Sequence, residues 1–227
     1  MSGKDLLGAL GALTLFTAAQ DIQAQTLSSI IGAGPVASGG LVLPNLISSN
    51  LVFFNFSETG TLPASSININ FTSNGIEFTS GWTTITPGYD SSIIQFDVAT
   101  TGGTITGTTL DMSGTTIVGN ASASVGETIT DLATNNIYSL QVFDGGAGNP
   151  NNSLSSSTTF NPAVTHIHIV KSIDVAAAAN GMASLNFVEN VFTGPATGVT
   201  PPVPEPMSLA LIPLALAGVA LRKKFVR

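Results

Sequence analysis

The chain has 227 residues and no cysteine, and only 8% of its residues are charged, against about 25% in an ordinary soluble domain. The lack of cysteine excludes disulfides, thiol nucleophiles and cysteine-ligated zinc. Between residues 25 and 203 a single basic side chain, Lys171, stands against ten carboxylates. This charge argues against nucleic-acid binding, because phosphate contacts need clustered lysine and arginine.

Residues 1–24 have the pattern of a secretory signal peptide. Lys4 is the only basic side chain of the N-terminal region. It is followed by Leu6–Ala19, an uncharged run of 14 residues, and then by small residues. As a helix this run is too short to cross about 30 Å of hydrocarbon comfortably. The sequence therefore predicts an N-terminal signal helix that is cleaved after Ala19 or Ala24. A buried N-terminal helix is the alternative.

Residues 25–198 form the predicted folded body, in which polar and apolar side chains alternate with a period of two. In Ser92–Ala99, for example, Ile94, Phe96 and Val98 share one face. Turn signals rich in glycine separate the runs. The pattern predicts an all-β fold, an antiparallel two-sheet β-sandwich of jelly-roll-like form. The predicted strands are 51–56, 66–71, 75–79, 92–99, 104–110, 115–118, 121–125, 137–143, 164–171 and 182–191.

For two stretches of the body the sequence predicts more detail, namely the faces of one strand and the position of one mobile loop. In Met182–Val191 the alternation places Ala183, Leu185 and Phe187 on one face, opposite the polar residues between them. Gly145–Thr159 is rich in glycine, asparagine and serine, and it is predicted to be a mobile loop.

His166 and His168 are the only histidines, and at i and i+2 of a strand they would face the same side. Both could then reach one metal ion, but a third donor would have to be a carboxylate or amide from another strand. The alternative is a pair of solvent-facing side chains beside the core positions Ile167 and Ile169. We expect the second arrangement, and therefore neither a metal site nor a cofactor.

Other chemistry has weaker support in the sequence. A serine hydrolase is disfavoured because the chain has no Gly-x-Ser-x-Gly motif, and its two candidate bases lie in one strand. Trp82, Tyr89 and Tyr138 could form a platform on which sugars stack, but we expect them to be core or edge residues. We therefore expect no catalytic residues and no enzyme.

The C-terminal part has three segments. Residues 199–206 are a proline-rich linker, Met207–Leu221 is an uncharged run of 15 residues, and residues 222–227 form a basic tail. As a helix the apolar run would be about 22 Å long, a short transmembrane span that the flanking basic side chains could complete by snorkelling. The positive-inside rule then places the tail in the cytoplasm and the acidic body on the other side of the membrane.

Val203-Pro204-Glu205-Pro206, followed by a short apolar helix and a basic cluster, resembles the sorting signal of the PEP-CTERM family. In that family an exosortase, a membrane-embedded transpeptidase-like enzyme, recognises the tail. Its members are associated with exopolysaccharide and biofilm production in Gram-negative bacteria. The resemblance implies that the processing enzyme reads a motif made of Pro204, Glu205, Pro206, Arg222, Lys223 and Lys224. The Arg-Lys-Lys cluster departs from the paired arginines that are commoner there. The alternative is a plain C-terminal membrane anchor.

The export signals and the resemblance to the PEP-CTERM family together imply a protein that is exported through the inner membrane and whose mature form lies at the outer surface or in the extracellular matrix. We expect an exosortase-sorted structural protein associated with exopolysaccharide. The alternatives are a carbohydrate-binding module on the cell surface and a metal-dependent surface enzyme using His166 and His168. The expected partners are exosortase, exopolysaccharide and, before processing, the membrane. An acidic polysaccharide would need Ca²⁺ bridges through carboxylates such as Asp90 and Asp97, whereas a neutral one would not.

Overall fold

The structure is a computed structural model that describes residues 25–32, 36–37, 41–42, 50–85 and 87–194. The predicted signal helix, the proline-rich linker, the predicted transmembrane helix and the basic tail lie outside these residues. Within the described part of the chain, no helix combines the length and the apolar character needed to span a bilayer.

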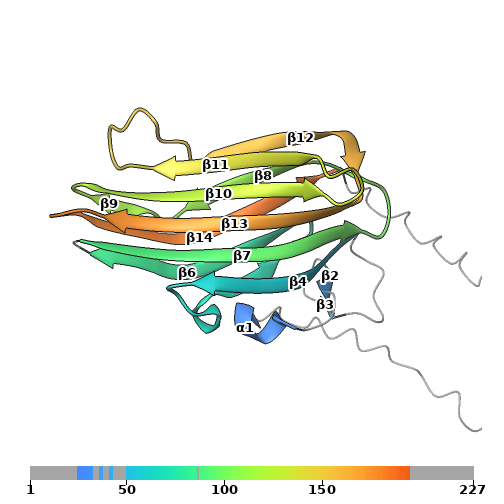
Figure 1. The fold of residues 1–227 in the computed structure, drawn as a ribbon, viewed down its shortest axis with the longest axis horizontal. Coiled ribbons are helices and arrows are strands. Elements are labelled where there is room, and N and C mark those ends of the chain that lie inside the picture. The colour runs from blue at the N-terminus through green and yellow to red at the C-terminus, as the bar shows by residue number, and fades with distance from the viewer. Residues whose placement is uncertain (1–24, 33–35, 38–40, 43–49, 86, 195–227) are drawn as a thin grey trace, which may run out of the picture.

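The described residues form two sheets in which every pair of neighbouring strands is antiparallel, and Figure 1 shows their strands running along the long axis of the body. Sheet A contains, in spatial order, β1 (Gln25–Thr26), β5 (Asn68–Phe71), β6 (Gly75–Ile85), β14 (Met182–Thr193), β8 (Ile105–Ser113) and β12 (Ser155–Val164), with β9 (Thr116–Val118) paired to β14. Sheet B contains β11 (Ile137–Asp144), β10 (Ala121–Asp131), β13 (His166–Ala177), β7 (Gly88–Thr100), β4 (Leu51–Gly60), β2 (Val36–Ala37) and β3 (Leu41–Val42). The short helix α1 (Leu27–Ile30) and the 3-10 turn η1 (Ala64–Ser66) complete the described elements.

The core lies between the two sheets and is built from the apolar half of each alternating strand. Phe96 of β7 meets Phe78 of β6 with 5.7 Å between the ring centroids, and Phe53 of β4 meets Phe192 of β14 at 6.0 Å. Full burial of such a side chain contributes about 1.5–3 kcal/mol. These contacts between facing sheets confirm the predicted all-β, two-sheet sandwich.

The predicted loop at Gly145–Thr159 is wrong in its last third, because β12 begins at Ser155. Ser155–Thr159 pairs with β8 at one edge of sheet A. This stretch carries only small polar side chains, so its two faces do not differ in the way that alternation detects. The buried apolar residues of β12, Phe160 and Val164, both lie in the second half of the strand.

The predicted faces of β14 are correct at its start and wrong after Leu185. Ala183 and Leu185 are buried as expected, but Phe187 is only half-buried. The register of β14 against β6 shifts between Leu185 and Phe187, which is a β-bulge. A bulge inserts one residue and exchanges the two faces of the strand beyond it. From that point Val188 and Asn190 point into the core.

Candidate functional site

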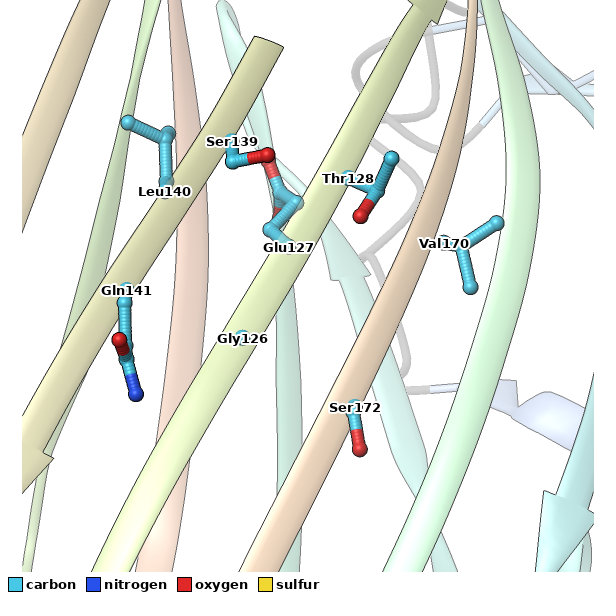
Figure 2. A pocket seen from close by; sticks show the side chains of 8 residues that line it. All are labelled: Gly126, Glu127, Thr128, Ser139, Leu140, Gln141, Val170 and Ser172. Atoms are coloured by element: carbon cyan, nitrogen blue, oxygen red, sulfur yellow. The ribbon is translucent and has the colours of Figure 1, made fainter. Parts of the chain in front are cut away.

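A hollow of about 490 Å³ opens on the outer face of sheet B, where β11, β10 and β13 lie side by side. We call it the Gly126 groove. Figure 2 shows the residues that line it. Its outward-facing polar residues are Thr128 on β10, Ser139 and Gln141 on β11, and Ser172 on β13. Glu127 of β10 and Leu140 of β11 also line the groove, but their side chains are buried.

Gly126 causes the hollow because it interrupts a row of side chains that crosses three strands. It pairs with Gln141 on one side and with Ser172 on the other, and Figure 2 shows the gap between them. The backbone does not require glycine here, since Gly126 is not among the residues with positive φ. A Cβ atom at this position would meet nothing within 4 Å. A glycine inside a strand costs about 0.5–1 kcal/mol relative to alanine, and it often marks a bulge, a bend, or the close approach of a ligand or another backbone.

The walls of the groove carry hydroxyl and amide groups and no outward charge. Thr128 and Ser139 each present one hydroxyl, which can both donate and accept hydrogen bonds, and Gln141 presents an amide with both functions. Val170 adds an apolar patch. Ser172 is engaged already, because its hydroxyl donates to Asp174 Oδ2 at 2.9 Å. Such a surface suits an uncharged ligand with many hydroxyl groups.

The two histidines lie on the same outer face, on either side of the carboxylate of Asp97. His168 Nδ1 is 2.6 Å from Asp97 Oδ1, and His166 Nε2 is 3.7 Å from Asp97 Oδ2. Both imidazoles are about one third exposed, at 39% for His166 and 32% for His168, so they are less open to solvent than expected. Ile167 and Ile169 are fully buried in the core, as predicted.

The structure thus supplies the carboxylate from another strand that the sequence could not identify. Its oxygens are occupied, however, because Asn55 Nδ2 donates to Asp97 Oδ2 at 2.7 Å while His168 lies on Oδ1. In the described ranges, no group of three or more histidine, cysteine or acidic residues could hold a metal ion. Asp97 is also only 7% exposed, which corrects its expected part in bridging Ca²⁺ to a polysaccharide.

The three aromatic candidates for a sugar platform do not share a face. Trp82 is fully buried, and its indole N–H donates to Ser92 Oγ at 3.0 Å inside the core. Tyr138 packs against Phe160 with 4.9 Å between ring centroids. Tyr89 alone is exposed, on β7, where its hydroxyl donates to Asp174. The expectation that Trp82 is a core residue is confirmed.

No family model matches the chain, and no curated protein matches it. Among solved structures, TmCBM61 in complex with beta-1,4-galactotriose is similar at a TM-score of 0.31 and 12% identity, over 59% of this chain and 86% of that one. The enzymatically active domain of tailspike protein 4 of bacteriophage CBA120 is similar at 0.27 and 14% identity, over 62% and 19%. A family 12 xyloglucanase from Bacillus licheniformis is similar at 0.22 and 10% identity, over 71% and 100%. These TM-scores are too low to carry an argument about this chain.

Proposed function

We propose that this chain is an exported surface protein whose β-sandwich binds a neutral glycan in the Gly126 groove, without a catalytic step. The observation that carries the binding proposal is the groove itself, an open hollow lined by uncharged hydroxyl and amide groups. The surface location rests on the sequence, through the signal pattern of residues 1–24 and the sorting motif at Pro204, Glu205 and Pro206. A structural role in a polysaccharide matrix follows if the bound glycan is the matrix polymer.

Charge favours a neutral ligand over an acidic one. The body carries one lysine against ten carboxylates, and that lysine is fully buried. An acidic polymer would therefore be repelled over about a Debye length, ~8 Å at physiological salt, with no exposed basic side chain in the body to oppose the repulsion. A neutral sugar meets no such barrier. Its hydroxyl groups can pair with Thr128, Ser139 and Gln141, and an apolar sugar face can lie on Val170.

Filling the groove tests this proposal. Gly126→Val adds a side chain where a Cβ meets nothing, so the fold should be retained and binding should be lost. Gly81→Val is the matched control, because Gly81 is an exposed strand glycine in β6 of the other sheet and its Cβ also meets nothing. The wild-type protein and both variants would be applied to an array of neutral and uronate-rich glycans.

We expect neutral-glycan binding by the wild type and by Gly81→Val, and at least a tenfold weaker signal for Gly126→Val. Equal melting temperatures of the three proteins would show that the sandwich is intact. Binding that survives in Gly126→Val would place the ligand elsewhere, and an array on which the wild type binds no glycan would refute the function.

A further inference from the structure

Three polar side chains, Glu127, Lys171 and Asn190, meet inside the core between the sheets. Lys171 and Asn190 have no exposed surface, and Glu127 is 3% exposed. Lys171 Nζ lies 2.5 Å from Glu127 Oε2, and Asn190 Nδ2 donates to Glu127 Oε1 at 2.9 Å. Glu127 of β10 and Lys171 of β13 pair directly in sheet B, whereas Asn190 comes from β14 of sheet A.

The surroundings of the three side chains are apolar. On sheet B, Lys171 is flanked in register by Ile94 and Glu127 by Leu140, and on sheet A Asn190 is flanked by Ile76 and Leu110. All four of these neighbours are buried core residues. An ion pair in such a place is a poor source of stability, because removing both charges from water costs about as much as their attraction returns, and apolar replacements are often neutral or stabilising. The arrangement therefore calls for another explanation.

Burial also makes the lysine a nucleophile. Desolvation lowers the pKa of the Lys171 amine, and the charge and hydrogen bond of Glu127 offset only part of that effect. A lysine amine that loses its proton in a dry pocket can attack a carbonyl carbon. Glu127 contacts both the amine and the side-chain amide nitrogen of Asn190 through its two oxygens. The same carboxyl group can thus take a proton from the one nitrogen and pass a proton to the other.

We propose that the chain forms an intramolecular amide bond between Lys171 Nζ and Asn190 Cγ, with Glu127 as the catalytic residue.

The reaction needs no oxidant and no second substrate. Lys171 first gives a proton to Glu127, which leaves a neutral amine beside a carboxylic acid. The amine attacks Asn190 Cγ, so that the Nζ–Cγ bond forms and the carbonyl becomes a tetrahedral intermediate. Glu127 then protonates Nδ2 and takes the surplus proton from Nζ, and the Cγ–Nδ2 bond breaks. Ammonia leaves, and lysine amine plus asparagine amide have become a secondary amide plus ammonia.

Packing supplies the conditions that such a reaction needs. The reacting groups are held together by the folded sandwich, and proximity of this kind replaces a bimolecular encounter. Asn190 Oδ1 has no hydrogen-bond partner among the described residues. The side-chain amide of Asn190 is therefore held through Nδ2, which donates to the Glu127 carboxyl group that would protonate it. The β-bulge between Leu185 and Phe187 is what turns Asn190 inward. In the product, β13 of one sheet would be tied covalently to β14 of the other, in a chain that has no cysteine for a disulfide.

Mass spectrometry of the folded full-length protein tests the proposal. After digestion with a protease that cuts at aromatic residues, we expect a branched peptide that joins the Lys171 segment to the Asn190 segment, lighter than the two linear peptides by one ammonia. Glu127→Gln, Lys171→Met and Asn190→Ala should each yield only linear peptides of full mass. Glu189→Gln is the matched control, because Glu189 precedes Asn190 on β14 but lies on the outer face, and it should retain the branched peptide.

The wild type alone can decide the matter if a variant fails to fold. A folded wild-type protein, shown by its β-type circular dichroism, that contains only linear peptides would overturn the proposal. So would a branched peptide that persists in Glu127→Gln at the wild-type rate, because the carboxyl group would then have no part in the reaction. A cross-linked wild type should also melt at a higher temperature than folded Lys171→Met. None of these readouts depends on glycan binding.

Discussion

Asp97 of β7 and His168 of β13 face each other on the outer face of sheet B, with 2.6 Å between Asp97 Oδ1 and His168 Nδ1. The second carboxylate oxygen accepts a hydrogen bond from Asn55. Asn55 has a positive φ of 57° within a β-bulge of β4 between Phe54 and Ser57. Because Asp97 is almost fully buried, its charge depends on these two partners in place of water.

His168→Ala should therefore destabilise the protein more than an exposed strand substitution does. Leaving a buried hydrogen-bond acceptor without its partner costs about 1–3 kcal/mol, and more when the acceptor is charged. His166→Ala is the natural control, because His166 Nε2 is 3.7 Å from Asp97, beyond hydrogen-bond range. Denaturant unfolding should show a clear loss for His168→Ala and a smaller one for His166→Ala. Equal losses below about 0.5 kcal/mol, the range of ordinary surface positions, would contradict this reading of the contact.

Trp82 offers a spectroscopic test, because it is the only tryptophan of the chain. Its burial and its hydrogen bond to Ser92 predict a blue-shifted emission that iodide does not quench in the folded protein. The emission should also stay unchanged when a neutral glycan binds in the Gly126 groove. A shift of the emission maximum on glycan addition would indicate a binding surface that includes Trp82, which the structure places inside the core.

The alternation of polar and apolar residues predicts the strands whose two faces differ. Ile94, Phe96 and Val98 form one predicted face, and all three are fully buried. The same signal is absent from Ser155–Thr159, where both faces are polar, so β12 could not be found from the sequence. β12 lies at the edge of sheet A, and within it only Phe160 and Val164 are buried apolar residues.

The candidate sites depend on relations that a single strand does not reveal. The Gly126 groove exists because Gln141, Gly126 and Ser172 come into register on three strands, and neither strand order nor register follows from the composition of the strands. The alternation of Ala183 and Leu185, if it is continued along the strand, places Asn190 on the opposite face, and a one-residue bulge reverses that placement. Lys171 interrupts an otherwise apolar face of β13, and Glu127 interrupts the face of β10 that carries Val125 and Ile129. These two interruptions are the sequence signal for a buried polar pair.

The two ends of the chain make a prediction that rests on the sequence. If residues 1–24 are a signal peptide and the Pro-Glu-Pro motif is read by an exosortase, mature protein should begin near Gln20 or Gln25 and end near Val203–Pro206. Mass spectrometry of protein released from the surface of its native host would identify both ends. Surface-exposed protein that retains Arg227 would exclude sorting and leave a membrane anchor as the role of the C-terminal segment.

Three carboxylates stand in one row on the outer face of sheet A, because Glu189 of β14 lies directly between Glu77 of β6 and Asp111 of β8. Partial burial raises the pKa of Glu189, and the negative charges of Glu77 and Asp111 raise it further. Asn70 relieves part of the crowding, since its amide donates to Glu77 Oε2 at 2.6 Å.

The raised pKa of Glu189 determines how the contribution of this residue to stability changes with pH. Folded Glu189 binds its proton more tightly than the unfolded residue does, so this residue contributes most to stability below the ordinary carboxyl pKa and the contribution is lost as the pH rises through the folded pKa. Glu189→Gln removes the charge and should stabilise the protein at neutral pH. Like charges directly opposite each other in a sheet are destabilising, and since cross-strand pairs contribute about 0.2–1 kcal/mol each, we expect a gain of that order. The gain should shrink as the pH falls, because wild-type Glu189 then becomes neutral as well.

The salt dependence of stability distinguishes burial from charge repulsion as the cause of the raised Glu189 pKa. Salt screens the repulsion from Glu77 and Asp111, so the advantage of Glu189→Gln at neutral pH should become smaller between low and high ionic strength. Glu58→Gln is the matched control, because burial alone raises the pKa of Glu58, with no neighbouring charge involved. Any stabilisation by Glu58→Gln should therefore change little with salt. Urea unfolding of both variants at two salt concentrations measures the difference. An identical salt response of the two variants would show that the row of carboxylates exerts no repulsion on Glu189.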